Sequence, residues 1–312
     1  MTNDAAPVMV EWFGAGGWTP IPDLVDVLEK DPAAYDARPG ARPAEDKALL
    51  AKAGVTVTDL TIPGDVPVQA RLYRPAEPHV SAAVVWVHGG GFIFYSLDGP
   101  EAHHISSVLA AGGIAVLSLD YRKAIGGVHY PAPSDDILTG WLWATQNLDR
   151  LGIEQVEELH LAGASAGGNL AAGVAKRLRD GAGPLPASVA LAYPFIGPNA
   201  QPVENPPTEA FPDWWLEQMA QNYVGDTALL TDPYAFPLNG TVAGLPPTFL
   251  VLSDIDTIRP SGEAYAAALE SAGVETHVHV EPGTTHGQLD RPGTRGAEET
   301  IAAIQDWLLR EN

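Results

Sequence analysis

The chain has 312 residues, of which 17 are Lys or Arg and 39 are Asp or Glu, so its formal net charge is -22. This charge repels phosphate backbones and anionic membrane surfaces, which argues against nucleic acid and membrane as partners. Because the sequence has no Cys, neither a disulfide framework nor a thiolate metal site can form.

The first residues carry Asp4 and no basic side chain, and no apolar stretch typical of a signal peptide follows them. No apolar run approaches the length needed to span a bilayer. We therefore expect a soluble, cytoplasmic protein. The length fits one large α/β domain with insertions.

Residues 1–54 show no strand alternation, and their apolar spacing predicts two helices, at Ile21–Glu29 and Ala44–Lys52. Such amphipathic segments are typical of a cover rather than of a sheet, so we interpret residues 1–54 as an N-terminal cap segment. The alternative is a partly disordered arm over residues 1–18, although Trp12 and Trp18 favour burial.

From Val55 the apolar period changes to two. Residues 55–62 and 68–73 alternate on either side of a Pro-Gly-Asp turn, which predicts a β-hairpin. Six further apolar strands and five helical segments follow in alternation. The strands are 82–87, 114–119, 159–162, 188–193, 248–252 and 276–280, and the helices are 102–111, 134–147, 167–179, 261–272 and 297–310. Apolar strands alternating with helices predict an α/β fold with a mostly parallel sheet covered on both faces.

Two stretches modify this pattern. In the helix at 134, Ser134 is placed to cap the N-terminus. Asp135 and Asp136 lie in its first turn, where carboxylates interact favourably with the helix dipole, so we interpret this pair as structural. Residues 196–247 are rich in Pro and carry one predicted helix, 213–223. Their aromatic residues favour a second cap segment over 196–232, inserted into a catalytic domain formed by 55–195 and 233–312. These aromatic residues are Phe211, Trp214, Trp215 and Tyr223.

The chemistry centres on residues 163–167, Gly-Ala-Ser-Ala-Gly, which lie between the strand 159–162 and a helix. A strand, a sharp turn and a helix hold the serine of such a motif as an exposed nucleophile. Small residues at positions 163 and 167 let the two backbones approach closely. Ser165 is therefore the candidate nucleophile, with the positive end of the helix directed at it.

A second glycine-rich stretch, residues 88–92 with the sequence His-Gly-Gly-Gly-Phe, directly follows the strand 82–87. Without a Cβ, its backbone N–H groups can approach an oxyanion closely. This is the arrangement expected beside a nucleophile of this type. The alternative, a flexible glycine loop, does not account for the order of the two motifs along the chain.

A serine hydroxyl needs a general base, itself oriented by a third group. Among nine histidines, His286 is best placed, because it lies just past the last strand in the loop that begins at Glu281. His277 and His279 share one face of a strand and are better explained by packing or solvation. The sequence has no His-Glu-x-x-His motif, so we expect no metal and no cofactor.

The orienting acid should follow the strand 248–252, where Asp254 and Asp256 both qualify. We prefer Asp256 and keep Asp254 as the alternative. The order Ser165, Asp256, His286 is then that of the α/β-hydrolases.

From about Val68 to the C-terminus the chain resembles the hormone-sensitive-lipase-like branch (bacterial family IV) of the α/β-hydrolases, which are carboxylesterases. The segments that carry the resemblance are 88–92, 120–122 (Asp-Tyr-Arg), 163–170, 232–234 (Asp-Pro-Tyr), 244–247 (Gly-Leu-Pro-Pro) and 286–287 (His-Gly).

The resemblance implies an α/β-hydrolase fold with a helical cap, a triad of Ser165, Asp256 and His286, and an oxyanion hole formed by the N–H groups of Gly90, Gly91 and Ala166. It implies a cofactor-independent serine esterase acting on small, short-acyl esters. In the cap and the glycine loop we expect Phe92, Trp214 and Trp215 to contact substrate. Pairing of two copies through the last strand and helix is also implied.

Four positions depart from the family pattern: Ala164 replaces Asp, Thr257 replaces Pro, Lys123 begins a stretch that differs from Leu-Ala-Pro-Glu, and Gln288 replaces an aromatic residue. None of them removes a candidate catalytic group. The same triad could hydrolyse lactones or amides, and a relative on this fold could be a non-catalytic binder of small ligands. Because all three roles are filled, we favour an enzyme.

Overall fold

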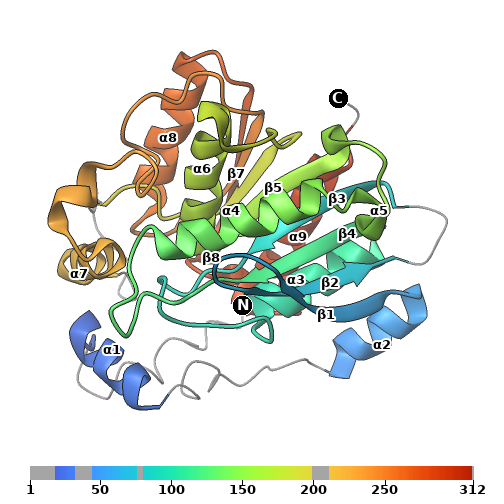
Figure 1. Cartoon of the computed structure of the whole chain (residues 1–312), viewed down its shortest axis with the longest axis horizontal. Helices are drawn as coiled ribbons and strands as arrows, with labels where there is room; N and C mark the ends of the chain where they lie inside the picture. The colour runs from blue at the N-terminus through green and yellow to red at the C-terminus, as the bar shows by residue number, and fades with distance from the viewer. Residues whose placement is uncertain (1–17, 32–43, 76–79, 199–210, 311–312) are drawn as a thin grey trace.

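The computed structural model of the chain describes residues 18–31, 44–75, 80–198 and 211–310. An eight-stranded sheet runs through its centre (Figure 1), in the order β1-β2-β4-β3-β5-β6-β7-β8. The first three strands in this order pair antiparallel, and the pairs from β4 to β8 are parallel. The strands are β1 (Thr56–Ile62), β2 (Val68–Arg74), β3 (Ala82–Val87), β4 (Ile114–Asp120), β5 (Leu159–Ala164), β6 (Val189–Ala192), β7 (Thr248–Ile255) and β8 (Thr276–Thr285).

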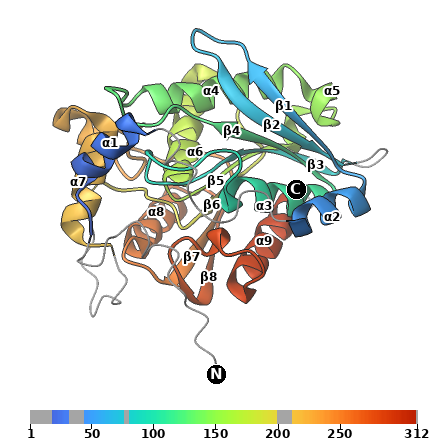
Figure 2. The same cartoon turned by 90° about the horizontal axis from the view of Figure 1, so that it is seen from below.

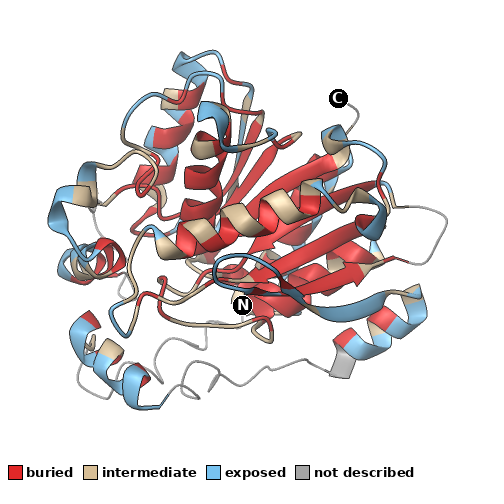
Figure 3. Ribbon diagram, viewed as in Figure 1, coloured by how far each residue is buried: buried red, intermediate tan, exposed pale blue. Residues whose placement is uncertain are grey.

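Alternation along each central strand explains why helices cover both faces of the sheet. In β3, Val85 and Val87 belong to the apolar core on one face, whereas Val84 and Trp86 belong to the core on the other. All six residues of β3 are buried, as the central strands are in Figure 3. The predicted α/β architecture is confirmed.

The helices form two layers, which Figure 2 shows on either side of the sheet. Apolar residues of α4, α6 and α8 pack on one face, and those of α2, α3 and α9 on the other. The helices are α1 (Ile21–Lys30), α2 (Ala44–Ala53), α3 (Pro100–Ala111), α4 (Ala132–Thr145), α5 (Leu148–Leu151), α6 (Ala166–Arg177), α7 (Asp213–Val224), α8 (Arg259–Ser271) and α9 (Arg295–Leu308). Within the described ranges, no helix has the length and apolar character needed to cross a membrane.

Two local predictions were wrong. Ser134 does not cap α4, because the helix starts two residues earlier, after Pro131, and the Ser134 hydroxyl instead accepts a hydrogen bond of 2.8 Å from Arg177. The segment 281–285 is not a loop but the end of β8, where Thr285 pairs with Ile255 after an irregularity in the register. The glycine and proline of this segment are accommodated by that irregularity, since β8 lies at the edge of the sheet.

Helices α1 and α7 pack against each other at one end of the molecule (Figure 2). The N–H of Ile21 donates to Gln218 at 3.0 Å, and the indole N–H of Trp215 donates to the carbonyl of Thr19 at 3.1 Å. The other N-terminal helix, α2, packs on α3 instead. Residues 1–17 and 32–43 of the predicted N-terminal cap segment, and residues 199–210 of the predicted second cap segment, lie outside the described residues.

Candidate active site

Ser165 occupies the tight turn between β5 and α6, where its φ is 52°. A non-glycine residue with this φ is strained, and such strain persists only where the surrounding structure enforces it. Here the enforcement comes from close backbone contacts: a Cβ on Gly163 would lie 2.5 Å from the carbonyl oxygen of Gly167, and a Cβ on Gly167 would lie 2.2 Å from that of Val87. The turn therefore presents the serine at the carboxyl end of the sheet.

The hydroxyl of Ser165 lies 2.9 Å from Nε2 of His286, within hydrogen-bonding distance. His286 directly follows β8, which lies three strands from β5 in the sheet, so the fold brings together residues that are 121 positions apart in the chain. The rings of Tyr193 and Phe211 each contact the imidazole edge-on, with centroids 5.0 Å away. These rings leave only 14% of the His286 side chain exposed.

The other imidazole nitrogen, Nδ1, lies 2.7 Å from Oδ2 of Asp256. A carboxylate only accepts hydrogen bonds, so Nδ1 carries the proton and the lone pair of the neutral ring, on Nε2, faces Ser165. The second carboxylate oxygen of Asp256 accepts the N–H of Ile258 at 3.1 Å, which fixes its orientation.

The alternative acid, Asp254, does not reach the imidazole. It lies on the exposed side of the strand end, where it accepts hydrogen bonds from Arg259 at 3.2 Å and from the N–H of Gly283 at 3.1 Å. Asp254 therefore supports the end of β8, which leads to His286, without contacting the ring itself.

The electrostatic surroundings of His286 favour its protonated form. Burial lowers the pKa of the imidazole, but the charge and hydrogen bond of Asp256 outweigh it, and the carboxylates of Glu101 and Asp290 add to this effect, so the pKa of His286 is raised above its ordinary value. A base of raised pKa takes a proton more readily from a hydroxyl.

The glycine loop lies directly beside the serine. Gly90 and Gly91 have φ of 96° and 57°, conformations that favour glycine. A Cβ on Gly89 would lie 3.0 Å from Cβ of Ser165, so no larger residue fits between the loop and the nucleophile. The predicted proximity of the two glycine-rich motifs is confirmed.

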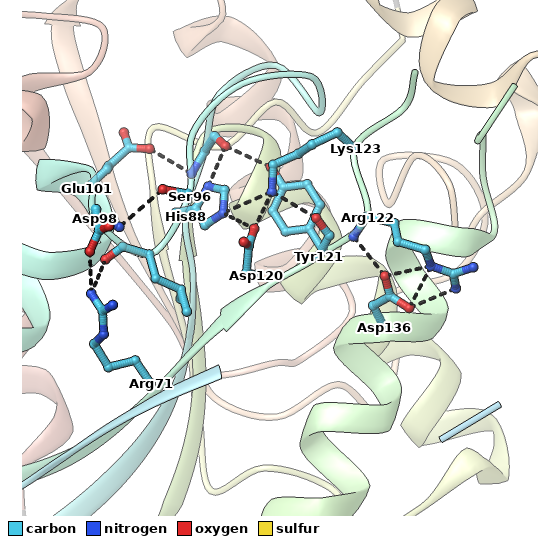
Figure 4. A network of polar contacts seen from close by, with 12 residues as sticks. Arg71, His88, Ser96, Asp98, Glu101, Asp120, Tyr121, Arg122, Lys123 and Asp136 are labelled. Carbon is cyan, nitrogen blue, oxygen red and sulfur yellow. Dashed lines mark hydrogen bonds and ion pairs between the residues drawn. The ribbon is translucent and has the colours of Figure 1, made fainter. Parts of the chain in front are cut away.

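Glu101 is a site residue that sequence reasoning missed. From the first turn of α3 it accepts the N–H of Gly89 at 2.7 Å (Figure 4). It also accepts the hydroxyl of Tyr193 at 2.6 Å. Burial, reinforced by the charge of Asp290, raises the pKa of Glu101 to about 7. In the sequence this acid is indistinguishable from one that favours a helix N-terminus, so only the packing of α3 under the glycine loop reveals its role.

The carbonyl of Gly89 is held from the opposite side. It accepts the hydroxyl of Tyr121 at 2.7 Å and lies 2.9 Å from Nδ1 of His88 (Figure 4). The rings of His88 and Tyr121 are stacked with centroids 4.8 Å apart. Both polar groups of Gly89 are thus bonded to buried side chains, which restrains the loop beside Ser165.

Aromatic side chains of the segments around α7 lie over this site. Phe211 stacks on Trp215 at 5.3 Å, and Trp18 contacts both rings. Met219 approaches the loop, since a Cβ on Gly91 would lie 3.0 Å from its sulfur and 4.0 Å from the Trp215 ring. These contacts connect α7 to both the glycine loop and the imidazole.

Of the predicted substrate contacts, Trp215 lies beside the glycine loop. Trp214 is 42% exposed, and Phe92 is fully buried, stacked on Tyr223 with centroids 3.9 Å apart. Contact of these three residues with substrate stays a prediction.

Gln288, one of the departures from the family pattern, and His279 each have structural partners. Gln288 accepts the hydroxyl of Ser253 at 2.7 Å and donates to Thr300 at 3.2 Å, which links β7 to α9. His279 pairs with Glu281 at 2.9 Å. Across the parts of the chain that the structure describes, no group of three or more His, Cys, Asp or Glu side chains is arranged to hold a metal ion.

Comparisons with known proteins agree with this geometry. The family model described as the alpha/beta hydrolase fold matches residues 84–290. A carboxylic ester hydrolase of Mycobacterium tuberculosis is 32% identical over 96% of this chain and 80% of its own length. An ethyl acetate hydrolase of Pseudomonas putida is 30% identical over 76% of this chain and 78% of its own.

Among solved structures, the esterase from Mycobacterium marinum superposes with a TM-score of 0.76 at 29% identity, covering 92% of this chain and 90% of that one. The match to the family model spans both glycine-rich motifs, the strand ends and the residues of the site. The chain therefore belongs to the α/β hydrolase family, and within it to the hormone-sensitive-lipase-like group of esterases.

Proposed function

We propose that this chain is a serine carboxylesterase in which Ser165, His286 and Asp256 form the catalytic triad. Ser165 attacks the ester carbonyl, and Nε2 of His286 takes its proton and returns it to the leaving alcohol. Asp256 holds the imidazole in the tautomer that leaves Nε2 unprotonated. Water, whose proton His286 accepts, then attacks the acyl-enzyme. The carboxylic acid is released as the proton returns to Ser165.

One observation carries this proposal. A continuous chain of hydrogen bonds runs from Asp256 through His286 to Ser165, with distances of 2.7 Å and 2.9 Å, and it ends at a strained turn. The bond between His286 and Asp256 already has the direction needed for general base catalysis, because Nδ1 must be the donor to the carboxylate.

The proposed oxyanion hole consists of the N–H groups of Gly90, Gly91 and Ala166. The left-handed conformations of the two glycines and the position of Ala166 at the start of α6 support this assignment. Preorganised donors of this kind stabilise the tetrahedral intermediate, and removing one costs roughly 100- to 1000-fold in kcat.

We propose small, uncharged esters as substrates, with α1 and α7 as the cap over the site. Met219 and Trp215 lie close to Gly91, and Phe211 lies against His286, which restricts the volume around the reacting carbonyl. The relatives support this substrate class, since one is an ethyl acetate hydrolase and another an arylesterase of Saccharolobus solfataricus.

The test combines active-site labelling with turnover. We expect a fluorophosphonate to modify Ser165, detected by peptide mass analysis, and 4-nitrophenyl acetate to be hydrolysed. Ser165→Ala should abolish the adduct and lower kcat by several orders of magnitude while its circular dichroism spectrum is unchanged. Folded wild-type protein that is neither labelled nor active would contradict the proposal and favour a non-catalytic binder on this fold.

A further inference from the structure

Lys123 lies behind the glycine loop, and its ammonium group contacts three polar groups there (Figure 4). Its Nζ lies 2.6 Å from Oδ1 of Asp120, 2.8 Å from the carbonyl of Tyr121 and 3.3 Å from Nε2 of His88. The side chain is only 11% exposed.

The hydrogen bonds of His88 determine its tautomer. Nδ1 lies 2.9 Å from the carbonyl of Gly89, and a carbonyl oxygen only accepts, so Nδ1 carries a proton. Complete burial and the charge of Lys123 lower the pKa of His88, which keeps the ring neutral although the Asp120 carboxylate opposes this. Nε2 of the neutral ring therefore has a lone pair, and Lys123 is the donor that faces it.

The orientation of the Gly89 carbonyl determines the direction of an oxyanion donor. The C=O of Gly89 and the N–H of Gly90 belong to one planar trans peptide, so they point in opposite directions. Two side chains, His88 and Tyr121, donate to this carbonyl. Holding the carbonyl toward them holds the Gly90 N–H in the opposite direction.

We infer that Lys123 is a positioning residue for ester hydrolysis: by donating to Nε2 of His88 it holds the imidazole in the tautomer that bonds the Gly89 carbonyl, and so it aims the Gly90 N–H. This inference rests on the proposed function, since it gives that N–H a role in the oxyanion hole. Lys123 does not touch the reacting atoms.

Removal of Lys123 would leave Asp120 as the charged group nearest to Nε2, at 3.4 Å. The carboxylate then favours a proton on Nε2, and a neutral ring would turn its Nδ1 lone pair toward the Gly89 carbonyl. At low pH the imidazolium carries protons on both nitrogens and keeps both bonds. Without Lys123, the hydrogen bond from His88 to the Gly89 carbonyl, and with it the orientation of the Gly90 N–H, should therefore be lost as pH rises.

The experiment compares Lys123→Met with Lys123→Arg, which keeps a charged donor, using 4-nitrophenyl acetate between pH 6 and pH 9. For Lys123→Met we expect kcat relative to wild type to fall with rising pH, by on the order of tenfold at pH 9, with KM little changed. Lys123→Arg should remain close to wild type. Lys52→Met, at an exposed position on α2, controls for the loss of one positive charge.

A trifluoromethyl ketone provides a second readout, because its hemiketal oxyanion uses the same donors. Its inhibition constant should rise in Lys123→Met by about the factor that kcat falls. An unchanged ratio of kcat across the pH range, or a loss shared equally by Lys52→Met, would overturn the inference.

The tautomer can be measured without any activity. In wild-type protein labelled with [15N]histidine, long-range NMR correlations should show the His88 proton on Nδ1 and an unprotonated Nε2. The signals of His88 are identified by their absence in His88→Asn. A proton on Nε2, alone or together with Nδ1, at pH 8 would overturn the inference even if the lysine variants failed to fold.

These readouts separate the two proposals. If the wild type neither hydrolyses esters nor reacts at Ser165, the proposed function fails, whatever the tautomer of His88. If the wild type is active but Lys123→Met equals it at every pH, only the role of Lys123 fails.

Discussion

Three carboxyl groups influence the imidazole of His286, but only Asp256 is hydrogen-bonded to it. Glu101 is connected to the ring through Tyr193, which contacts both groups, and Asp290 acts through its charge. The carboxylate of Asp256 therefore fixes the orientation of the imidazole, and the other two raise its proton affinity.

The choice of acid leads to the first prediction. Asp256→Asn should lower kcat by about 10,000-fold, because an amide in contact with Nδ1 permits the wrong imidazole tautomer. Asp254→Asn is the matched control, and we expect its kcat to stay within about threefold of wild type, since its partners are Arg259 and Gly283. Steady-state hydrolysis of 4-nitrophenyl acetate measures both. A larger loss in Asp254→Asn would reverse the assignment.

The second prediction concerns pH. Because the pKa of His286 is raised, the base gains its proton, and activity is lost, as pH falls through a value above the ordinary 6.5. Glu101→Gln removes a negative charge that stabilises the imidazolium, so the acid limb of kcat/KM should move to lower pH. The exposed Glu217→Gln on α7 serves as a control. If the acid limb of kcat/KM lies at the same pH in Glu101→Gln as in wild type, electrostatic coupling between Glu101 and His286 is excluded.

At the scale of elements, the ends of the strands carry the site and the helices behind them hold it in place. Ser165 follows β5, Asp256 follows β7 and His286 follows β8, so all three reach the same edge of a parallel sheet. This is where open α/β sheets generally bind ligands. Helix α3 contributes Glu101, whose carboxylate accepts the N–H of Gly89 in the glycine loop.

The turn between β5 and α6 tolerates no added methyl group at Gly167. A Cβ there would lie 2.2 Å and 2.3 Å from the carbonyl oxygens of Val87 and His88, and backbone atoms cannot move away as a flexible side chain could. We expect Gly167→Ala to lower the free energy of unfolding by about 3 kcal/mol and to reduce kcat, as measured by urea denaturation and ester hydrolysis. Gly99→Ala, whose Cβ has ordinary contacts of 3.5 Å, should cost less than about 1 kcal/mol. Equal urea midpoints for the two variants would refute the argument.

A buried ion pair attaches α2 to the domain. His104 on α3 contacts Asp46 at 2.7 Å and Glu298 at 3.3 Å. Burial lowers the pKa of His104, but the hydrogen bonds and charges of the two acids outweigh it, so the pKa is raised above 6.5. The stabilisation is therefore complete below the unfolded-state pKa and is lost as pH rises through the folded-state pKa.

Asp46→Asn keeps a hydrogen-bond acceptor but removes the charge. We expect the difference in free energy of unfolding between wild type and Asp46→Asn to be larger at pH 6 than at pH 9, measured by urea denaturation at both. His277→Gln, at an exposed position on β8, should leave the pH dependence of the wild type unchanged. If this difference in free energy of unfolding is the same at both pH values, the charges of His104 and Asp46 do not stabilise the fold.

At the scale of the whole molecule, the charge of -22 creates a negative field around a site that already contains several carboxylates. An anionic ester should be repelled on approach. We expect kcat/KM for the 4-nitrophenyl monoester of succinate to lie about tenfold or more below that for 4-nitrophenyl butyrate at low ionic strength. Addition of 0.5 M NaCl should narrow this gap by screening, with little effect on the neutral ester. A gap insensitive to salt would indicate a steric rather than electrostatic cause.

Much of the architecture could be predicted because it depends on local patterns. The hairpin, the central strands and the long helices follow from apolar periods of two and 3.6, and the close backbone contacts of the serine turn require the small residues of its motif. Helix and strand ends were less predictable. Ser134 has the chemistry of a cap, yet α4 starts two residues before it, and its hydroxyl accepts a hydrogen bond from Arg177, a tertiary contact that no local pattern indicates.

Local sequence patterns were enough to predict the sheet, the sharp serine turn and the glycine loop, and they limited the candidate acid to two neighbouring aspartates. The folded structure was needed to show that Asp256, and not Asp254, contacts His286, because this contact depends on how the chain bends after β7. It alone placed Glu101 and Lys123 on opposite sides of the glycine loop. Such contacts join residues distant in the chain, and no local period encodes which buried charge will face which backbone group.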